Sequence, residues 1–298
     1  MEFSQLAAVV AVADHGSFTA AARALEQSQP AVSLAVKKVE AELGIALFER
    51  LSAGVVLTTA GEAFVAPARR ALHERATARD AVRSVTGLTA GHLDLAVIPG
   101  LAADLVAPLV GAFRRRHPGV TVHLRDPEGD ESVEDLVRRG RSELGFCALP
   151  TTAEGLVSQV LDEQELFAVL SPGHARSLAR DGRVPLERLA ELPLITAPER
   201  ASSHAQLAQA LDAVGAVLEP VVVSDHRDAI TSLVLAGAGA AVLPRSIAEA
   251  TTSDWVQVLA LDPPITRAVG LVHRGGGLSP AGQALVALAL EARPTSSG

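Results

Sequence analysis

The stretch Ser28-Gln29-Pro30-Ala31-Val32-Ser33 decides how the first part of this chain folds. Ser28 is a good N-cap residue, and Pro30 is tolerated in the first turn of a helix because the N–H groups there have no intrahelical acceptor. An apolar stripe follows at helical spacing, made of Val32, Val36, Val39 and Leu43. Gly44 can end the helix in the left-handed conformation, so we expect a helix over residues 28–43.

Two shorter helices are expected before this one. The first stops at His15-Gly16 and has an apolar face made of Phe3, Leu6, Val10 and Ala13. Ser17 can cap the second, whose inner face consists of Phe18, Ala21, Ala22 and Leu25. Glu26-Gln27-Ser28 leaves room only for a turn. Three helices with a tight turn between the last two predict a helix-turn-helix.

The residues after Gly44 predict a wing and a long helix. Strands 47–50 and 55–58 surround Ser52-Ala53-Gly54, as in a short hairpin. Residues 59–86 have helical spacing throughout, which predicts a helix about 40 Å long. A small domain cannot cover that length, so we expect this helix to pair with a second copy. Packing on the chain's own C-terminal part is the alternative.

Residues 87–91 predict a hinge, and strands then alternate with helices. Strands are expected at 93–98, 120–124, 144–149, 166–170, 194–196, 221–223, 240–243 and 268–273, and helices at 104–117, 131–139, 203–214, 226–236 and 279–291. This alternation predicts parallel sheets, and two such lobes leave a cleft at their strand ends. The fold class is multidomain α/β: a winged helix-turn-helix (1–58), a linker helix (59–87) and a two-lobed, periplasmic-binding-protein-like domain (88–298). Lobe one is residues 91–161 plus 266–292, and lobe two is 162–265.

The net charge of −8 alone argues against a nucleic-acid partner, because phosphate contacts require cations. Residues 1–87, however, hold nine basic and nine acidic residues, so the excess negative charge lies in the rest of the chain. Lys37 and Lys38 are the only lysines of the whole chain. The single Cys147 rules out an internal disulfide, and no apolar run reaches membrane-spanning length. We expect a cytoplasmic protein that does not bind membranes.

The helix of residues 28–43 offers a face that can read DNA. Gln29, Ser33 and Lys37 recur every four residues, largely apart from the valine stripe. Glutamine can pair with adenine, while serine and lysine reach base edges or phosphates. Two basic clusters elsewhere, Arg114-Arg115-Arg116 and Arg138-Arg139, end helices and are expected to offset the helix dipole instead.

The same segment resembles the N-terminal domain of LysR-type transcriptional regulators. The matching residues are Ala21-Ala22, Leu25, residues 28–33, Val36, Val39-Glu40, Leu43-Gly44, Leu47-Phe48, Arg50, Leu57-Thr58 and Ala60-Gly61, and residues 108–120 and 235–244 match the family's effector domain more loosely. The resemblance implies a homodimer through the long helix, commonly a homotetramer, and a small-molecule effector between the lobes. The expected DNA-binding residues are Ser17, Thr19, Arg23, Ser28, Gln29, Pro30, Ser33, Lys37, Lys38 and Arg50.

Two positions depart from the family pattern. Leu34 stands where many members carry arginine, and Ala53 occupies a wing-tip position that is often basic. Each lost phosphate contact lowers the logarithmic salt slope of binding by about 0.9. Compared with family members that are basic at these positions, this protein is expected either to depend more on Lys37, Lys38 and the pairing of its subunits, or to bind DNA weakly.

The effector site is expected on loops at the strand ends. The candidates are Pro99, Gly100, Leu101, Asp126, Cys147, Ala148, Thr196, Ser202, Ser203, His204 and His226. Free N–H groups and hydroxyls at the start of helix 203–214 suit a carboxylate, so an anionic effector is expected. Ser202 as a plain helix cap is an alternative reading that is compatible with this role.

Enzymatic motifs are missing from the sequence. It contains no G-x-S-x-G, P-loop or H-E-x-x-H motif, and Ser224-Asp225-His226 are adjacent residues that do not assemble a triad. We therefore expect no catalytic residue, no metal and no cofactor. The resulting hypothesis is a sequence-specific, effector-controlled regulator that binds double-stranded operator DNA. The alternative is a solute-binding or enzymatic α/β protein with an incidental helical domain.

Overall fold

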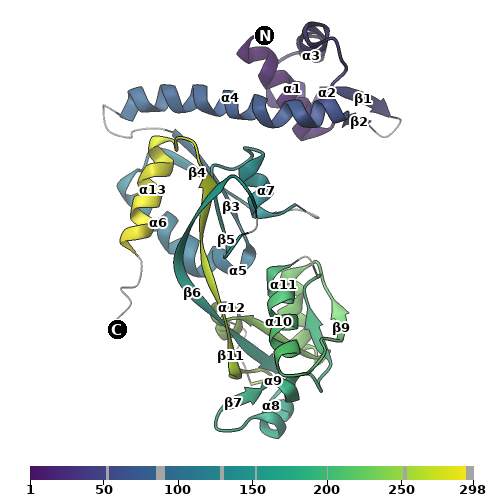
Figure 1. The fold of residues 1–298 in the computed structure, drawn as a ribbon, viewed down its shortest axis with the longest axis vertical. Coiled ribbons are helices and arrows are strands. Elements are labelled where there is room, and N and C mark those ends of the chain that lie inside the picture. The colour runs from purple at the N-terminus through teal and green to yellow at the C-terminus, as the bar shows by residue number, and fades with distance from the viewer. Residues whose placement is uncertain are drawn as a thin grey trace.

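The computed structural model describes residues 1–51, 54–84, 91–127, 131–151, 153–199, 201–250 and 254–292. Ser52 and Ala53 of the expected wing tip, and residues 87–90 of the expected hinge, lie outside these ranges. Figure 1 shows a small helical domain packed against the long helix α4, with two α/β lobes below it. Within the described ranges, no helix combines the length and apolarity needed to cross a bilayer.

The helix-turn-helix is confirmed, and it consists of α1 (Phe3–His15), α2 (Phe18–Ala24) and α3 (Gln29–Leu43). Ser17 Oγ accepts a hydrogen bond from the Ala20 amide, and Ser28 Oγ accepts one from the Ala31 amide. Both serines therefore act as N-caps. Gly16 and Gly44 end α1 and α3 with φ of 59° and 70°, a left-handed conformation that glycine adopts without strain.

The expected apolar face of α1 was wrong except for Ala13, which packs against the domain core. Phe3 is 44% exposed, and the residues buried in the domain core are Ala8, Val9, Ala11 and Val12. Because α1 is apolar on nearly all sides, spacing alone cannot identify its buried face, and packing against α2, α3 and α4 decides it. In α3, Val32, Val36 and Val39 are buried as expected. Leu43 is exposed, one turn beyond Val39, the last α3 residue in the core.

The wing is a hairpin of β1 (Phe48–Leu51) and β2 (Gly54–Leu57), paired antiparallel. The Val55 amide donates to the Gly16 carbonyl at 3.1 Å, which joins the wing to the turn between α1 and α2. Glu40 of α3 accepts hydrogen bonds from the Leu47 amide at 2.8 Å and the Phe48 amide at 3.3 Å. The carboxylate of Glu40 thus fixes the position of the wing relative to α3.

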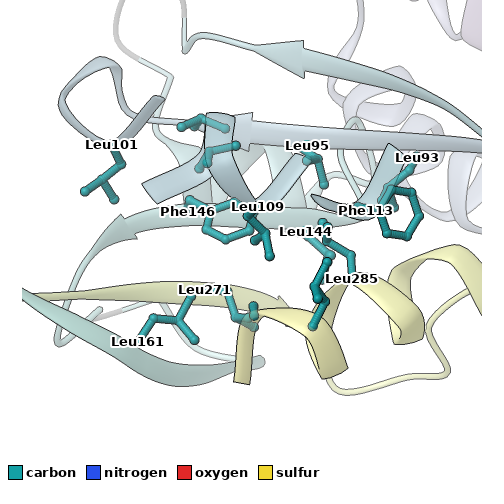
Figure 2. Close-up of a cluster of buried hydrophobic side chains, with 14 of the residues drawn as sticks. Leu93, Leu95, Leu101, Leu109, Phe113, Leu144, Phe146, Leu161, Leu271 and Leu285 are labelled. Carbon is teal, nitrogen blue, oxygen red and sulfur yellow. The ribbon is translucent and has the colours of Figure 1, made fainter. Parts of the chain in front are cut away.

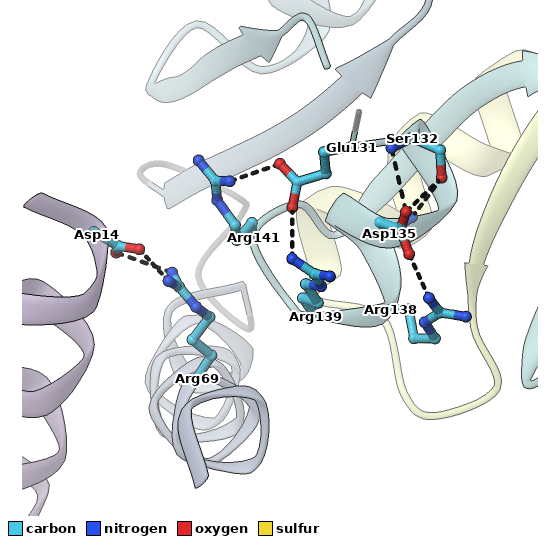
Figure 3. Close-up of polar contacts among 8 residues, drawn as sticks. All are labelled: Asp14, Arg69, Glu131, Ser132, Asp135, Arg138, Arg139 and Arg141. Carbon is cyan, nitrogen blue, oxygen red and sulfur yellow. Dashed lines mark hydrogen bonds and ion pairs between the residues drawn. The ribbon is translucent and has the colours of Figure 1, made fainter. Parts of the chain in front are cut away.

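The long helix α4 (Thr59–Ser84) touches both parts of the molecule. Its 26 residues span about 39 Å. On one side Arg69 forms an ion pair with Asp14 of α1, as Figure 3 shows. On the other side His73 Nε2 lies 3.9 Å from Glu143 Oε2 of the α/β region. Val82, near the end of α4, remains 73% exposed.

Lobe one is built on the parallel strands β3 (Gly91–Val97), β4 (Val120–Arg125) and β5 (Leu144–Ala148). Its helical segments are α5 (Pro99–Leu101), a π-helical turn (Ala102–Val106), α6 (Ala107–Arg116), α7 (Val133–Arg138) and α13 (Pro280–Glu291). Figure 2 shows buried side chains of the lobe's core, including Phe113 of α6 and Phe146 of β5. Each fully buried side chain of this size contributes about 1.5–3 kcal/mol.

Lobe two repeats the arrangement with the parallel strands β8 (Leu194–Thr196), β9 (Pro220–Val223) and β10 (Ala240–Pro244). Around them lie α8 (Pro172–Leu178), β7 (Arg183–Pro185), α9 (Leu186–Leu189), α10 (Ser202–Ala213), α11 (Arg227–Leu235) and α12 (Arg245–Ala250). Two clusters of buried side chains form its core, one on each side of the sheet. The sequence does not predict α8, β7, α9 or α12, which are short.

Two long antiparallel strands, β6 (Leu156–Leu170) and β11 (Gln257–Arg274), run through both lobes. The strand order across the whole sheet is β4-β3-β5-β11-β6-β10-β8-β9, with β7 beside β11. Both strands are longer than expected, because only their buried portions carry an apolar run that reads as a strand. The helix expected at 104–117 begins earlier, at Pro99, and includes the π-helical turn.

Gly61 is a point where α4 approaches the wing too closely for a side chain. A Cβ atom added there would lie 2.1 Å from the Leu47 carbonyl oxygen, whereas one added at Gly111 of α6 would meet nothing nearer than 3.6 Å. Gly61→Ala should therefore destabilise the N-terminal domain by about 1–3 kcal/mol through overpacking. Gly111→Ala should stabilise lobe one by about 0.5–1 kcal/mol by restricting the unfolded chain.

Thermal unfolding followed by circular dichroism, on the full chain, measures both changes. Gly111→Ala serves as the matched control, because it is the same substitution in a helix with room for the methyl group. Equal melting curves for the two variants would contradict the close contact at Gly61.

Candidate nucleic-acid interface and interlobe cleft

The side of α3 opposite its valine stripe is open to solvent. Of the residues expected to bind DNA there, Gln29, Pro30, Lys37 and Lys38 are exposed and Ser33 is half-buried. An amide, a hydroxyl and two ammonium groups on one helix can donate to base edges and phosphate oxygens in a major groove. This outward face of α3 is hereafter called the reading face.

Five further residues expected to bind DNA lie around the reading face. Ser17 and Ser28 sit at the helix starts, where their hydroxyls cap α2 and α3. Thr19 and Arg23 are exposed on α2. Arg50 belongs to β1, and its side chain lies outside the described part of the structure. Free amides at helix starts and nearby hydroxyls are suitable for phosphate oxygens.

A cleft of about 800 Å³ opens between the two lobes. Ligand sites in proteins are commonly clefts of this size. Six of the residues expected to contact an effector line it, namely Pro99, Asp126, Cys147, Ala148, Ser202 and His226. The parallel strands of both lobes end at this cleft, which explains why loops so far apart in sequence come together.

The other five candidates lie elsewhere. Leu101 is 1% exposed and packs in the core of lobe one. The Gly100 carbonyl accepts a hydrogen bond from Gln164 Nε2 at 2.8 Å. Thr196, Ser203 and His204 line a separate cavity of about 30 Å³ inside lobe two. Thr196 is the last residue of β8, and Ser203 and His204 lie on the side of α10 that faces its own lobe. The spacing of the sequence could not distinguish this side from the one at the cleft.

Arg267 is a buried charge beside the cleft that sequence reasoning missed. It lies on β11 and is 5% exposed. Its guanidinium donates to Gln164 Oε1 at 2.6 and 2.8 Å, to Ser202 Oγ at 3.1 Å and to Gln206 Oε1 at 3.2 Å. Arg267 therefore joins the crossing strand β6 to the start of α10. The only signal for it in the sequence is an arginine directly before the apolar run Ala268–Val272.

The start of α10 is open towards a ligand. Ala201 occupies the N-cap position, and its carbonyl accepts hydrogen bonds from the His204 and Ala205 amides. Its side chain has no acceptor for the amides of Ser202 and Ser203. Ser202 is the first helical residue, which overturns its reading as the helix cap. Free amides, the Ser202 hydroxyl and the nearby Arg267 guanidinium all favour a negatively charged group.

The opposite wall of the cleft is acidic. Its lining residues include Asp126, Glu131 and Glu134 of lobe one, whereas Asp225 lines the cleft from lobe two. Glu131 forms ion pairs with Arg141 at 2.7 Å and Arg139 at 3.5 Å, as Figure 3 shows. The side chains of Arg139 and Arg141 are thus engaged within the protein. No group of three side chains suited to a metal ion occurs in the described ranges.

The helix start at Ser132 forms part of the same wall. Ser132 caps α7, and Asp135 accepts hydrogen bonds from the Ser132 amide and hydroxyl (Figure 3). Burial raises the pKa of Asp135, but these hydrogen bonds and the Arg138 guanidinium outweigh it and hold the pKa below its ordinary value. The Arg138 side chain is thus also engaged within the protein. Asp135 remains a carboxylate at neutral pH, which keeps α7 capped beside the cleft.

Two family models together cover nearly the whole chain. The model described as "Bacterial regulatory helix-turn-helix protein, lysR family" matches residues 3–62, and "LysR substrate binding domain" matches residues 86–294. The chain belongs to the LysR family. It is a LysR-type transcriptional regulator with a helix-turn-helix DNA-binding domain and an effector-binding domain. The alternative of an α/β protein with an incidental helical domain is thereby overturned.

Named relatives agree with this assignment. TfdS of Cupriavidus pinatubonensis is 32% identical over 83% of this chain and 84% of its own length. ClcR of Pseudomonas putida is 30% identical over 94% of this chain and 95% of its own. A third relative, the "Probable hydrogen peroxide-inducible genes activator" of Streptomyces viridosporus, is 30% identical over 92% of this chain and 88% of its own length. All are named as regulators of genes.

Solved structures share the fold over the full chain. Full-length OxyR from Pseudomonas aeruginosa has a TM-score of 0.78 at 24% identity, covering 97% of this chain and 93% of that one. CbnR in complex with its target DNA has a TM-score of 0.69 at 25% identity, covering 98% and 99%.

Cys147 of this LysR regulator has an inert thiol. It is 3% exposed, and burial together with the neighbouring Glu134 carboxylate raises its pKa well above the ordinary value. The reactive form of cysteine is the thiolate, which is scarce here at neutral pH. With one cysteine in the chain, no internal disulfide can form either. The thiol therefore lines the cleft as an apolar group.

We expect iodoacetamide at pH 8 to label Cys147 at least tenfold more slowly in the native protein than in the unfolded chain, as followed by mass spectrometry. The folded state holds the thiol proton more strongly, so the free energy of unfolding should also fall as the pH rises above the ordinary cysteine pKa of about 8.5. In Cys147→Ala the free energy of unfolding should not show this fall at alkaline pH. Equal labelling rates in the two states would show that the thiol is accessible and ionised.

Proposed function

We propose that this LysR regulator recognises its operator through the reading face of α3 and responds to a small molecule bound in the interlobe cleft. The observation that supports the first part is the exposure of Gln29, Lys37 and Lys38 on a capped helix whose opposite side buries Val32, Val36 and Val39. In this proposal Gln29, Pro30 and Ser33 contact bases. Phosphate contacts come from Ser17, Thr19, Arg23, Ser28, Lys37, Lys38 and Arg50.

The proposed active form is a homodimer that assembles further into a homotetramer. A helix as long as α4 keeps part of its surface open within one chain, including Val82. A second copy of α4 would cover this surface and place two reading faces on one duplex. We also propose the division of the chain into residues 1–58, 59–87 and 88–298, and a cytoplasmic location, where the DNA is. The relatives are regulators, and we propose no catalysis, cofactor or metal for this chain.

The cleft suggests the chemistry of the effector. The start of α10, with Ser202 and Arg267, favours a carboxylate, as expected for an anionic effector. The facing wall, with Glu134 at the start of α7, favours hydrogen-bond donors or a positive charge. We therefore propose an effector with a carboxylate at one end and an amine or hydroxyl groups at the other. Closure of the lobes around it would change the spacing or bending of the DNA-bound subunits.

The DNA-binding proposal predicts different outcomes for a base contact and a phosphate contact. Gln29→Ala should reduce discrimination between operator and mutant operators at particular base pairs, costing about 1–3 kcal/mol of specificity. Lys38→Ala should weaken all sequences alike and reduce the logarithmic salt slope by about 0.9. Footprinting and fluorescence anisotropy at several salt concentrations measure both. If neither protected DNA at low salt nor a difference between these variants were found, the reading face would be wrongly assigned.

For the cleft, matched ligands should differ in the thermal shift that they cause. We expect small carboxylates bearing an amine or hydroxyl groups to raise the melting temperature, and their amides to do so less. Ser202→Ala should weaken binding of such a ligand about fivefold or more, because it removes a hydroxyl at the start of α10. Ser203→Ala is the matched control, since Ser203 faces the cavity inside lobe two. Equal losses in both variants would place the ligand elsewhere.

A further inference from the structure

The reading face carries one large apolar side chain. Leu34 is 56% exposed. It follows the buried Val32 by two residues, which places it about 200° around the helix, near the centre of the solvent side. Pro30 lies one turn before Leu34, and Lys37 and Lys38 lie one turn after it, so the four side chains share one surface.

The neighbours of Leu34 indicate what covers it. A protein partner that buried Leu34 would also have to remove two ammonium groups from water, which is costly without matching carboxylates. A DNA duplex can both cover Leu34 and pair with the two ammonium groups. Its phosphates accept hydrogen bonds from the lysines while the helix lies in the major groove. The Leu34 side chain, at the centre of this face, then points towards the base edges.

Base edges in the major groove offer one apolar group. Adenine, guanine and cytosine present nitrogen and oxygen donors or acceptors there, whereas thymine adds its C5 methyl group. Leucine has no hydrogen-bonding group and gains nothing from the polar edges. Contact with the methyl group removes apolar surface of both partners from water.

We propose that Leu34 recognises the C5 methyl group of a thymine in each operator half-site. This proposal rests on the proposed binding of DNA by the reading face. Leu34 thus acts as a specificity-determining residue: it favours thymine over cytosine, which lacks the methyl group. An arginine at this position would attract DNA of any sequence through its charge. Leu34 lacks that attraction and instead gives a preference at one base pair.

The test replaces thymine by deoxyuridine, which removes the methyl group and leaves the base-pairing groups unchanged. The full-length protein is bound to its footprinted operator, in which each thymine is replaced in turn. One position in each half-site should lose about three- to fivefold in affinity, the value expected for one buried methyl group. Leu34→Ala should bind the thymine operator more weakly by a similar factor and should no longer distinguish thymine from deoxyuridine there.

Two further variants serve as controls. Lys38→Ala should weaken binding of both operators and leave the ratio of their affinities unchanged. Leu34→Met keeps an apolar side chain of similar volume, so it should retain the preference for thymine. Retention by Leu34→Met also separates loss of the contact from any folding defect in Leu34→Ala.

The proposal is overturned if Leu34→Ala still distinguishes thymine from deoxyuridine at the same position, or if no position responds in the wild-type protein. It is also overturned if Leu34→Ala binds the operator normally but changes the sedimentation behaviour, since Leu34 would then belong to a contact between subunits. If the wild-type protein binds its operator normally but does not respond to deoxyuridine, only the proposed role of Leu34 is contradicted. If no footprint is found at low salt, the proposed binding of DNA by the reading face is contradicted as well.

Discussion

The antiparallel pairing of β6 with β11 connects the two lobes of the effector-binding domain. The pairing runs from Gln257 opposite Leu170 to Arg274 opposite Leu156. The chain passes from lobe one to lobe two in β6 and returns in β11, while β5 and β10 attach the parallel strands of the lobes to either side. The two lobes can therefore change their relative orientation only by bending this pair. The contact between Arg267 and Gln164 lies within it, beside the cleft.

One short helix connects the cleft with the linker helix. Ser132 and Glu134, at the start of α7, line the cleft. Past the other end of α7, Gly140 lies against α4, where an added Cβ atom would be 3.5 Å from Arg69 Cβ. Nearby, the buried carboxylate of Glu143 accepts hydrogen bonds from the amide and hydroxyl of Ser279 at 2.6 and 2.9 Å. The short helix α7 thus lies between the cleft and the helix that carries the DNA-binding domain.

The N-terminal domain could be predicted closely from the sequence because its signals are local. Serine caps, glycines in the left-handed conformation and a valine stripe all act within a few residues. The face of α1 could not be predicted, since an almost wholly apolar helix acquires its orientation only from its neighbours. In the effector-binding domain, strand ends predicted six lining residues of the cleft. Arg267 could not be found, because its position depends on the pairing of β11 with β6, about a hundred residues apart in sequence.

The two lysines of α3 have a chemical consequence. Every ε-amino group of the protein lies on the exposed reading face, at Lys37 and Lys38, and the effector-binding domain contains none. Apart from the N-terminal amine, reagents that acylate amines can modify only this surface. Acetylation would remove two positive charges from α3 and leave the charges of the cleft unchanged. Acylation therefore alters the proposed DNA-binding surface, while ligand binding by the unmodified cleft can be measured in the same molecule.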